Sequence, residues 1–198
     1  MEIVVAVTGA SGAVYARRFL ELTAGRVDRV HLVVSEPGRR VAALELGPPG
    51  GEGAEAATLL GATGGHVTAY EEDDWNSPLV SGSSTWEAMV IVPCSMGTLG
   101  RVAAGVADNV IARAADVALK ERRRLILVCR ETPLSLVHLR NMVAVAEAGG
   151  VVLPACPGWY HRPTDVGQIV DFVVQRIYRL LGLELGLVSA WGEAAQEE

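Results

Sequence analysis

The sequence lacks several features that would assign it to a common protein class. Its 198 residues contain no apolar run near the roughly 20 residues that a membrane-spanning helix needs. It has only three cysteines, Cys94, Cys129 and Cys156, and their odd number and wide spacing match neither a disulfide framework nor a metal site, so we interpret them as small buried apolar residues. Strand-forming residues begin directly at Met1-Glu2-Ile3 without a basic segment, so we expect no signal peptide and a cytoplasmic protein.

Charge is also scarce: 20% of the residues are charged, whereas half are hydrophobic. The net charge of −6 argues against nucleic acid or an anionic membrane as a partner. The apolar content is high for a soluble monomer of this length, so we expect part of it to lie in the interfaces of a homo-oligomer. The length suits one domain, and no repeat or domain boundary is visible from residue 1 to residue 198.

Two nicotinamide-binding signatures are missing as well. An apolar strand pattern at 2–7 runs into Thr8-Gly9-Ala10-Ser11-Gly12 and then into a helical pattern, an arrangement that directs backbone N–H groups at a phosphate. The third glycine of the dinucleotide fingerprint would fall at Tyr15, and no tyrosine has a lysine four residues later. The turn therefore predicts a phosphate site rather than a nicotinamide site, with a plain tight turn as the alternative.

Polar residues follow three further strand patterns, at 30–34, 88–92 and 125–129. Because ligands of open α/β sheets bind beyond the carboxyl ends of the strands, we expect these segments to help enclose one cofactor. The three segments are Ser35, Pro93-Cys94-Ser95-Met96-Gly97-Thr98 and Arg130-Glu131-Thr132-Pro133. Ser35 is also expected to cap a helix. Shorter strands are expected at 66–70 and 151–153.

A helix is predicted from Asn109 to Arg123, and it carries charges on an otherwise apolar stripe. Arg113, Asp116 and Lys120 stack on one face of this helix, which indicates a polar site. The run 122–124 is interpreted as a basic, solvated surface.

The remaining segments give weaker signals. Glu45 is a single acid near the end of the helix that follows Ser35, and a short helix is expected at 55–60 within a surface excursion. Arg176 lies on a final helix opened by Thr164-Asp165, and a surface role is its simplest interpretation. The acidic tail from about residue 193 is expected to fray.

Taken in the order in which they occur along the chain, the motifs resemble those of the UbiX-type flavin prenyltransferases over nearly its whole length. The matching segments are Thr8-Gly9-Ala10-Ser11-Gly12, Ser35, Ser81-Gly82-Ser83, Pro93-Cys94-Ser95-Met96-x-Thr98, Arg113 to Arg122, Arg130-Glu131-Thr132-Pro133, Leu153 to Tyr160, and Trp191-Gly192. Two departures are Ala190, where the family often has Arg, and Cys129, where Pro is common.

The resemblance implies an α/β fold, a single-domain, Rossmann-like or flavodoxin-like three-layer sandwich with a mostly parallel sheet. It implies a homododecamer with sites at subunit interfaces and no metal. The implied reaction joins the dimethylallyl group of dimethylallyl phosphate to N5 and C6 of reduced FMN, closing a fourth ring and releasing phosphate. The product, prenylated FMN, would serve a UbiD-type decarboxylase.

The resemblance also implies roles for individual residues. FMN would be held by Gly9, Ala10, Ser11, Ser35, Ser95, Met96, Gly97, Thr98 and Arg130. The substrate phosphate would be bound by Arg113, Lys120, Tyr160 and Arg176. Five residues are implied to be catalytic. Glu45 would take the ring proton, Glu131 would assist proton transfer, and Lys120 and Arg130 would act on the leaving phosphate. Trp191 would lie beside the allylic cation, with Trp75 as the alternative for this role.

Three other functions remain open. Decarboxylation of cysteinyl peptides is disfavoured because that flavoprotein class uses a histidine on its first helix, and this helix has none. Direct decarboxylation of aromatic acids is the second. A non-enzymatic FMN-binding regulator is the third, and the presence of Lys120, Arg130, Glu131 and Tyr160 together argues against it.

Overall fold

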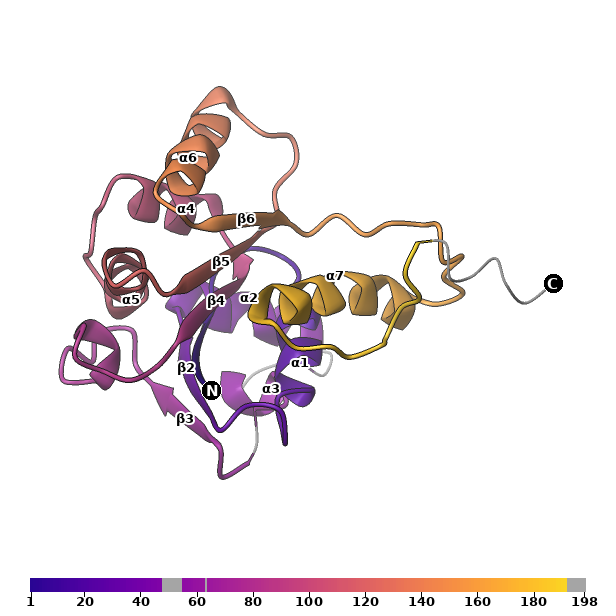
Figure 1. Cartoon of the computed structure of the whole chain (residues 1–198), viewed down its shortest axis with the longest axis horizontal. Coiled ribbons are helices and arrows are strands. Elements are labelled where there is room, and N and C mark those ends of the chain that lie inside the picture. Colours follow the sequence, from indigo (N-terminus) through magenta and orange to yellow (C-terminus); the bar gives the residue numbers. More distant parts are fainter. Residues whose placement is uncertain (48–54, 63, 192–198) are drawn as a thin grey trace.

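The computed structural model describes residues 1–47, 55–62 and 64–191, and its centre is a six-stranded sheet (Figure 1). The strands are β1 (Glu2–Val7), β2 (Arg29–Val34), β3 (Val67–Tyr70), β4 (Ala88–Cys94), β5 (Arg124–Cys129) and β6 (Val151–Pro154). Every pairing in the sheet is parallel, and the strand order is β3-β2-β1-β4-β5-β6. The chain therefore reverses its direction of travel across the sheet between β1 and β4, and this reversal creates a crevice at their carboxyl ends.

Helices cover both faces of the sheet, which confirms the three-layer sandwich. The helices are α1 (Ala13–Glu21), α2 (Glu36–Leu46), α3 (Ala56–Leu59), α4 (Met96–Ala103), α5 (Val110–Lys120), α6 (Leu136–Glu147) and α7 (Val166–Leu181), with a 3₁₀ turn η1 (Pro78–Val80). Residues of α1, α2, α3 and α7 share one buried cluster, and residues of α4, α5 and α6 share the other. The strands between these clusters are buried on both faces, which explains why β1, β4 and β5 are almost uninterrupted apolar runs.

Side-chain caps fix most helix starts. Ser35, Ser95, Asn109, Ser135 and Asp165 each accept a hydrogen bond from the backbone N–H three residues later. The cap at Ser95 starts α4 at Met96, so the polar segment after β4 runs directly into this helix.

The predicted 109–123 helix ends at Lys120 because the chain reverses there. Arg122 has a φ of 57°, and the N–H groups of Arg122 and Arg123 donate to the carbonyls of Leu119 and Ala118. This is the hydrogen-bond pattern of a Schellman motif, with Arg122 at the left-handed position that glycine usually occupies. It sets the direction in which Arg123 leaves the helix.

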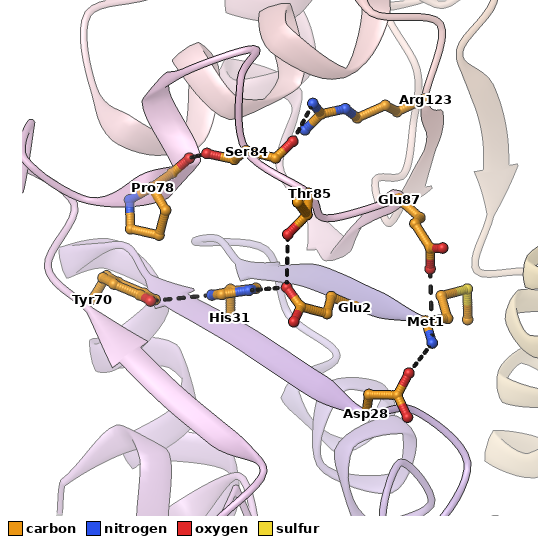
Figure 2. Close-up of polar contacts among 10 residues, drawn as sticks. All are labelled: Met1, Glu2, Asp28, His31, Tyr70, Pro78, Ser84, Thr85, Glu87 and Arg123. Carbon is orange, nitrogen blue, oxygen red and sulfur yellow. Dashed lines mark hydrogen bonds and ion pairs between the residues drawn. The ribbon is translucent and has the colours of Figure 1, made fainter.

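A polar network lies on the face of the sheet that α5 covers, toward the amino end of β1 (Figure 2). The ring of His31 is 4% exposed, with Nδ1 3.1 Å from the Tyr70 hydroxyl and Nε2 3.4 Å from Glu2 Oε2. Thr85 donates to the same Glu2 oxygen. Burial lowers the pKa of His31 and outweighs the opposing effect of the Glu2 carboxylate.

The structure corrects one expectation about the cysteines and tests two others only in part. Cys94 and Cys129 are buried, but Cys156 is exposed, so the apolar interpretation is wrong for Cys156. The expected helix at 55–60 is α3, whereas residues 48–54 of the same excursion and the acidic tail from 193 lie outside the described residues. Among the described helices, none is long and apolar enough to cross a membrane.

Candidate functional site at the carboxyl edge of the sheet

Thr8 joins the two turns that flank the crevice. Its hydroxyl donates to the carbonyl of Pro93 at 2.8 Å and accepts from the N–H of Ser95 at 2.8 Å. The turn after β1 and the turn after β4 are therefore held at a fixed spacing. In the sequence, Thr8 was identified only as part of a motif. No pattern of residues near it predicts that its side chain links the two turns.

The turn after β1 presents backbone to the crevice. Gly9 and Ser11 are exposed, whereas the side chain of Ala10 is buried, so Ala10 offers its backbone alone. Gly12 has a φ of +116° and begins α1, a conformation that a side chain would strain. The predicted flavin contacts at Gly9, Ala10 and Ser11 are thus sterically reasonable and stay predictions.

Glu45 reaches the amino terminus of α1 from the last turn of α2. Its carboxylate accepts from the N–H of Gly12 at 2.9 Å and from the N–H of Ala13 at 2.8 Å. Two backbone donors and the positive end of the helix dipole both favour a negative charge at this point. The structure therefore places a fixed carboxylate beside the glycine turn, and the phosphate of a flavin would have to use the other donors of this edge.

Hydroxyl groups supply those other donors. Ser95 and Thr98 lie 3.1 Å apart through their side-chain oxygens at the amino terminus of α4, and Ser35 caps α2 on the neighbouring strand end. Gly97 is exposed in the same turn. Met96, in contrast, packs its side chain into the core, so only its backbone is available for the predicted flavin contact.

Arg130 crosses the end of β4 to reach the first turn. Its Nε donates to the carbonyl of Ser11 at 2.9 Å, although β4 separates β5 from β1. Within the described residues Arg130 has no carboxylate partner. Glu131 is exposed next to it, and its carboxylate accepts from the N–H of Thr132.

An apolar pocket of about 390 Å³ lies between β6 and α7 and adjoins this edge. Leu153, Pro157, Phe172 and Val173 line it, and Arg176 supplies its only cationic lining residue in the described part of the chain. Burial raises the pKa of Tyr15, Cys156 adds to the rise and Arg130 opposes it, so Tyr15 is within electrostatic range of a pocket residue and of Arg130.

Tyr160 and Trp191 lie on an arm that extends away from the sheet, made of the segment after β6, the first turns of α7 and the end of the described chain (Figure 1). The two rings meet edge to face with centroids 5.2 Å apart. Tyr160 also contacts Phe172, and the Arg176 guanidinium lies 6.0 Å from the Phe172 ring centroid. The predicted residues Tyr160, Arg176 and Trp191 thus form one cluster with Phe172, which lines the pocket. Trp75, in contrast, follows β3 at the opposite edge of the sheet.

Lys120 and Arg113 do not join these groups within one chain. Lys120 precedes β5 and Arg130 follows it, and at about 3.3 Å per residue the six residues of β5 separate the two ends by roughly 20 Å. Lys120 is paired with Glu121, and Arg113 contacts Asp116 and the carbonyl of Val80. One phosphate cannot contact Lys120 and Arg130 of the same protomer.

Known proteins resemble the chain over almost its full length. A family model described as Flavoprotein matches residues 1–178. The flavin prenyltransferase UbiX of Pseudomonas aeruginosa is 45% identical over 96% of this chain and 94% of its own length, and UbiX of Methanocaldococcus jannaschii is 41% identical over 97% and 99%. The chain belongs to the UbiX family of flavin prenyltransferases.

Solved structures of UbiX relatives agree with this membership. AnUbiX, crystallised in complex with FMN and dimethylallyl pyrophosphate, has a TM-score of 0.85 and 37% identity, with 96% of both chains covered. A dodecameric FMN-dependent UbiX-like decarboxylase from Escherichia coli O157:H7 has a TM-score of 0.86 and 36% identity, covering 96% of this chain and 99% of that one. The Rossmann-like fold expected from the motifs is therefore confirmed.

Proposed function

We propose that this protein transfers the dimethylallyl group of dimethylallyl phosphate to reduced FMN and releases inorganic phosphate. The observation that carries the proposal is an apolar pocket, lined by the cation Arg176, next to the edge of the sheet at which Arg130 also lacks an acidic partner among the described residues. Arg130 and Arg176 make no ion pair among the described residues, so a bound phosphate is the natural partner for their charge. FMN in the AnUbiX complex supports the choice of flavin.

The residues of this chain support a division of labour in the reaction. The allylic C–O bond breaks as phosphate leaves, and Arg130, Arg176 and the Tyr160 hydroxyl stabilise the charge that develops on the phosphate oxygens. The exposed face of Trp191 shields the allylic group from water and stabilises its positive charge. Reduced FMN supplies the nucleophilic N5 and C6 atoms.

Glu45 is proposed to take the proton that C6 loses when the second bond forms. The backbone N–H groups of Gly12 and Ala13 hold its carboxylate in a fixed position beside the glycine turn, which supports this role. Glu131 is exposed at the same edge and is proposed to pass protons to the departing phosphate.

We further propose that the working site is shared between copies of the chain in a homododecamer. The separation of Lys120 from Arg130 supports this, because a second copy must supply Lys120 if both act on one phosphate. Four apolar side chains of α6 are exposed in the single chain, which supports burial in an assembly: Leu136, Val137, Leu139 and Val143. The dodecameric relative from E. coli supports the stoichiometry.

The product is proposed to be prenylated FMN for a UbiD-type decarboxylase. The test is anaerobic incubation of the purified protein with reduced FMN and dimethylallyl phosphate, followed by the mass and absorbance of the flavin and by phosphate release. Preference for FAD or NADPH over FMN would contradict the cofactor assignment. Carbon dioxide release from a phenolic acid, without prenylation, would favour the aromatic-acid decarboxylase instead.

A further inference from the structure

The segment from Val80 to Thr85, here called the 80–85 loop, lies against α5 and the residues that follow it. Arg113 Nε donates to the Val80 carbonyl at 3.0 Å at the start of the loop. Arg123 Nη2 donates to the Gly82 carbonyl at 2.7 Å and to the Ser84 carbonyl at 2.6 Å. Cations from α5 and its carboxyl-terminal extension thus hold the loop at both ends.

Arg123 makes more contacts within the protein than the solvated run of three arginines at 122–124 led us to expect. Besides the two carbonyl contacts, its guanidinium carbon lies 4.2 Å from the ring centroid of Trp86, which is 2% exposed. Arg122 and Arg124 are exposed, whereas Arg123 is partly buried. The expectation that 122–124 is a solvated run is therefore wrong for Arg123, because the Schellman turn directs it back toward the loop.

The loop also closes on itself, which makes it a rigid unit. Figure 2 shows Arg123 at the carbonyl of Ser84, whose hydroxyl donates to the carbonyl of Pro78. The hydroxyls of Ser81 and Ser83 lie 2.8 Å apart within the same turn. A displacement of the Arg123 guanidinium would therefore move the turn as a whole.

Gly82 brings this unit into contact with Lys120. A Cβ at position 82 would lie 2.6 Å from Lys120 Nζ and 2.2 Å from Glu121 Oε1, so the loop backbone passes directly against the Lys120–Glu121 ion pair. A larger residue here would displace the ends of the Lys120 and Glu121 side chains. The position of the loop limits where the Lys120 ammonium can lie.

We infer that Arg123 is a positioning residue for prenyl transfer: by clamping the 80–85 loop through two carbonyls and the Trp86 ring, it fixes the Lys120 ammonium for the substrate phosphate. The inference rests on the proposed function, in which Lys120 acts on that phosphate. The contacts of Arg123 are the carbonyls of Gly82 and Ser84 and the ring of Trp86, so we expect it to act on the rate through the loop and Lys120.

The test is a double-mutant cycle with Lys120→Ala and Arg123→Met, measured as kcat/KM for dimethylallyl phosphate with saturating reduced FMN. On the wild-type background we expect Arg123→Met to lower kcat/KM about 10-fold, and on the Lys120→Ala background less than 2-fold. FMN affinity should stay within 2-fold, because neither Arg123 nor the 80–85 loop is among the residues proposed to hold FMN. Arg124→Met removes the same charge from an exposed neighbour and should change kcat/KM less than 2-fold.

Two variants keep the test decisive if Arg123→Met folds poorly. Arg123→Lys keeps the charge but loses the planar fork, so it should recover only part of the rate. Gly82→Ala changes no charge and pushes on the Lys120–Glu121 pair from the loop side, so it should show the same dependence on Lys120. The inference is overturned if Arg123→Met is within 2-fold of wild type, or if it costs the same factor with and without Lys120. If Lys120→Ala alone keeps the wild-type rate, the proposed phosphate role of Lys120 fails instead.

Discussion

The two basic regions of this protein, the carboxyl edge of the sheet and the α5 surface, use their charges in opposite ways. At the edge, Arg130 contacts a backbone carbonyl and has no acidic partner in the described chain. On α5, Arg113 pairs with Asp116 and Lys120 pairs with Glu121. A cation without an acidic partner can bind an anion directly. A cation in an ion pair binds an anion only when a ligand or another subunit displaces its carboxylate partner.

The largest effect is expected when the charge of Arg130 is removed from the carboxyl edge of the sheet. Arg130→Ala should lower the rate of prenylation by about 100- to 1,000-fold, because a charge-assisted contact to the departing phosphate is lost. FMN binding should be largely retained through the Ser35 and Ser95 turns. Single-turnover mass spectrometry and a flavin titration measure the two effects. Arg26→Ala, which removes an exposed arginine from the turn between α1 and β2, is the charge-matched control. A wild-type rate for Arg130→Ala would remove its phosphate role.

The separation of the two regions is tested by mixing subunits. Lys120→Ala and Arg130→Ala chains that are co-expressed with different tags should recover activity, because about a quarter of randomly assembled two-subunit sites would then contain both intact residues. Arg130→Ala mixed with Glu45→Gln is the control, since both residues line the edge of one protomer and no recovery is expected. Equal activity of the two mixtures would show that the regions do not meet across subunits.

A smaller loss is expected at the carboxylate of the edge. Glu45→Gln should slow formation of the fully cyclised product by about 100-fold, the lower end of the range for a lost general base. Phosphate release should be slowed much less, because C–O cleavage precedes the loss of the ring proton. Parallel assays of phosphate and of product absorbance separate the two. Normal cyclisation by Glu45→Gln would assign the proton to another group.

The smallest effect concerns the contribution of His31 to stability. Burial lowers the pKa of His31, so below the ordinary histidine pKa of about 6.5 the unfolded chain takes up a proton that the folded chain resists. The contribution of His31 is thus present above that pH and is lost as the pH falls toward the lowered value. His31→Gln should flatten the decline in the free energy of unfolding between pH 7 and 5, measured by urea titration. An unchanged slope would assign the decline to other groups.

Local patterns predicted the sheet and the strand-end turns well. The apolar run 125–129 became β5 with one added residue, and the polar residues after β1, β4 and β5 do meet at one edge. Helix ends were less predictable: the stop at Lys120 depends on a left-handed Arg122, which favours no such conformation by itself.

Long-range contacts account for what the sequence could not indicate. The bonds of Glu45 to Gly12 and Ala13 span more than thirty residues, and those of Arg123 to the 80–85 loop about forty. Both depend on how helices pack on the sheet rather than on any local pattern. The family resemblance named Glu45 as a base, but only the structure shows what holds it, and nothing in a run of three arginines distinguishes Arg123.

The bond between Glu45 and α1 also has an evolutionary consequence. The side chain acts as the cap of a helix that begins 32 residues before it, and loss of such a cap costs about 0.5–2 kcal/mol of folding free energy. Selection for a folded protein would therefore retain an oxygen acceptor at position 45 even in a descendant that no longer prenylates flavin. A glutamate here cannot by itself distinguish an active homologue from an inactive one, and Arg130, which caps no helix, is the more informative residue for that purpose.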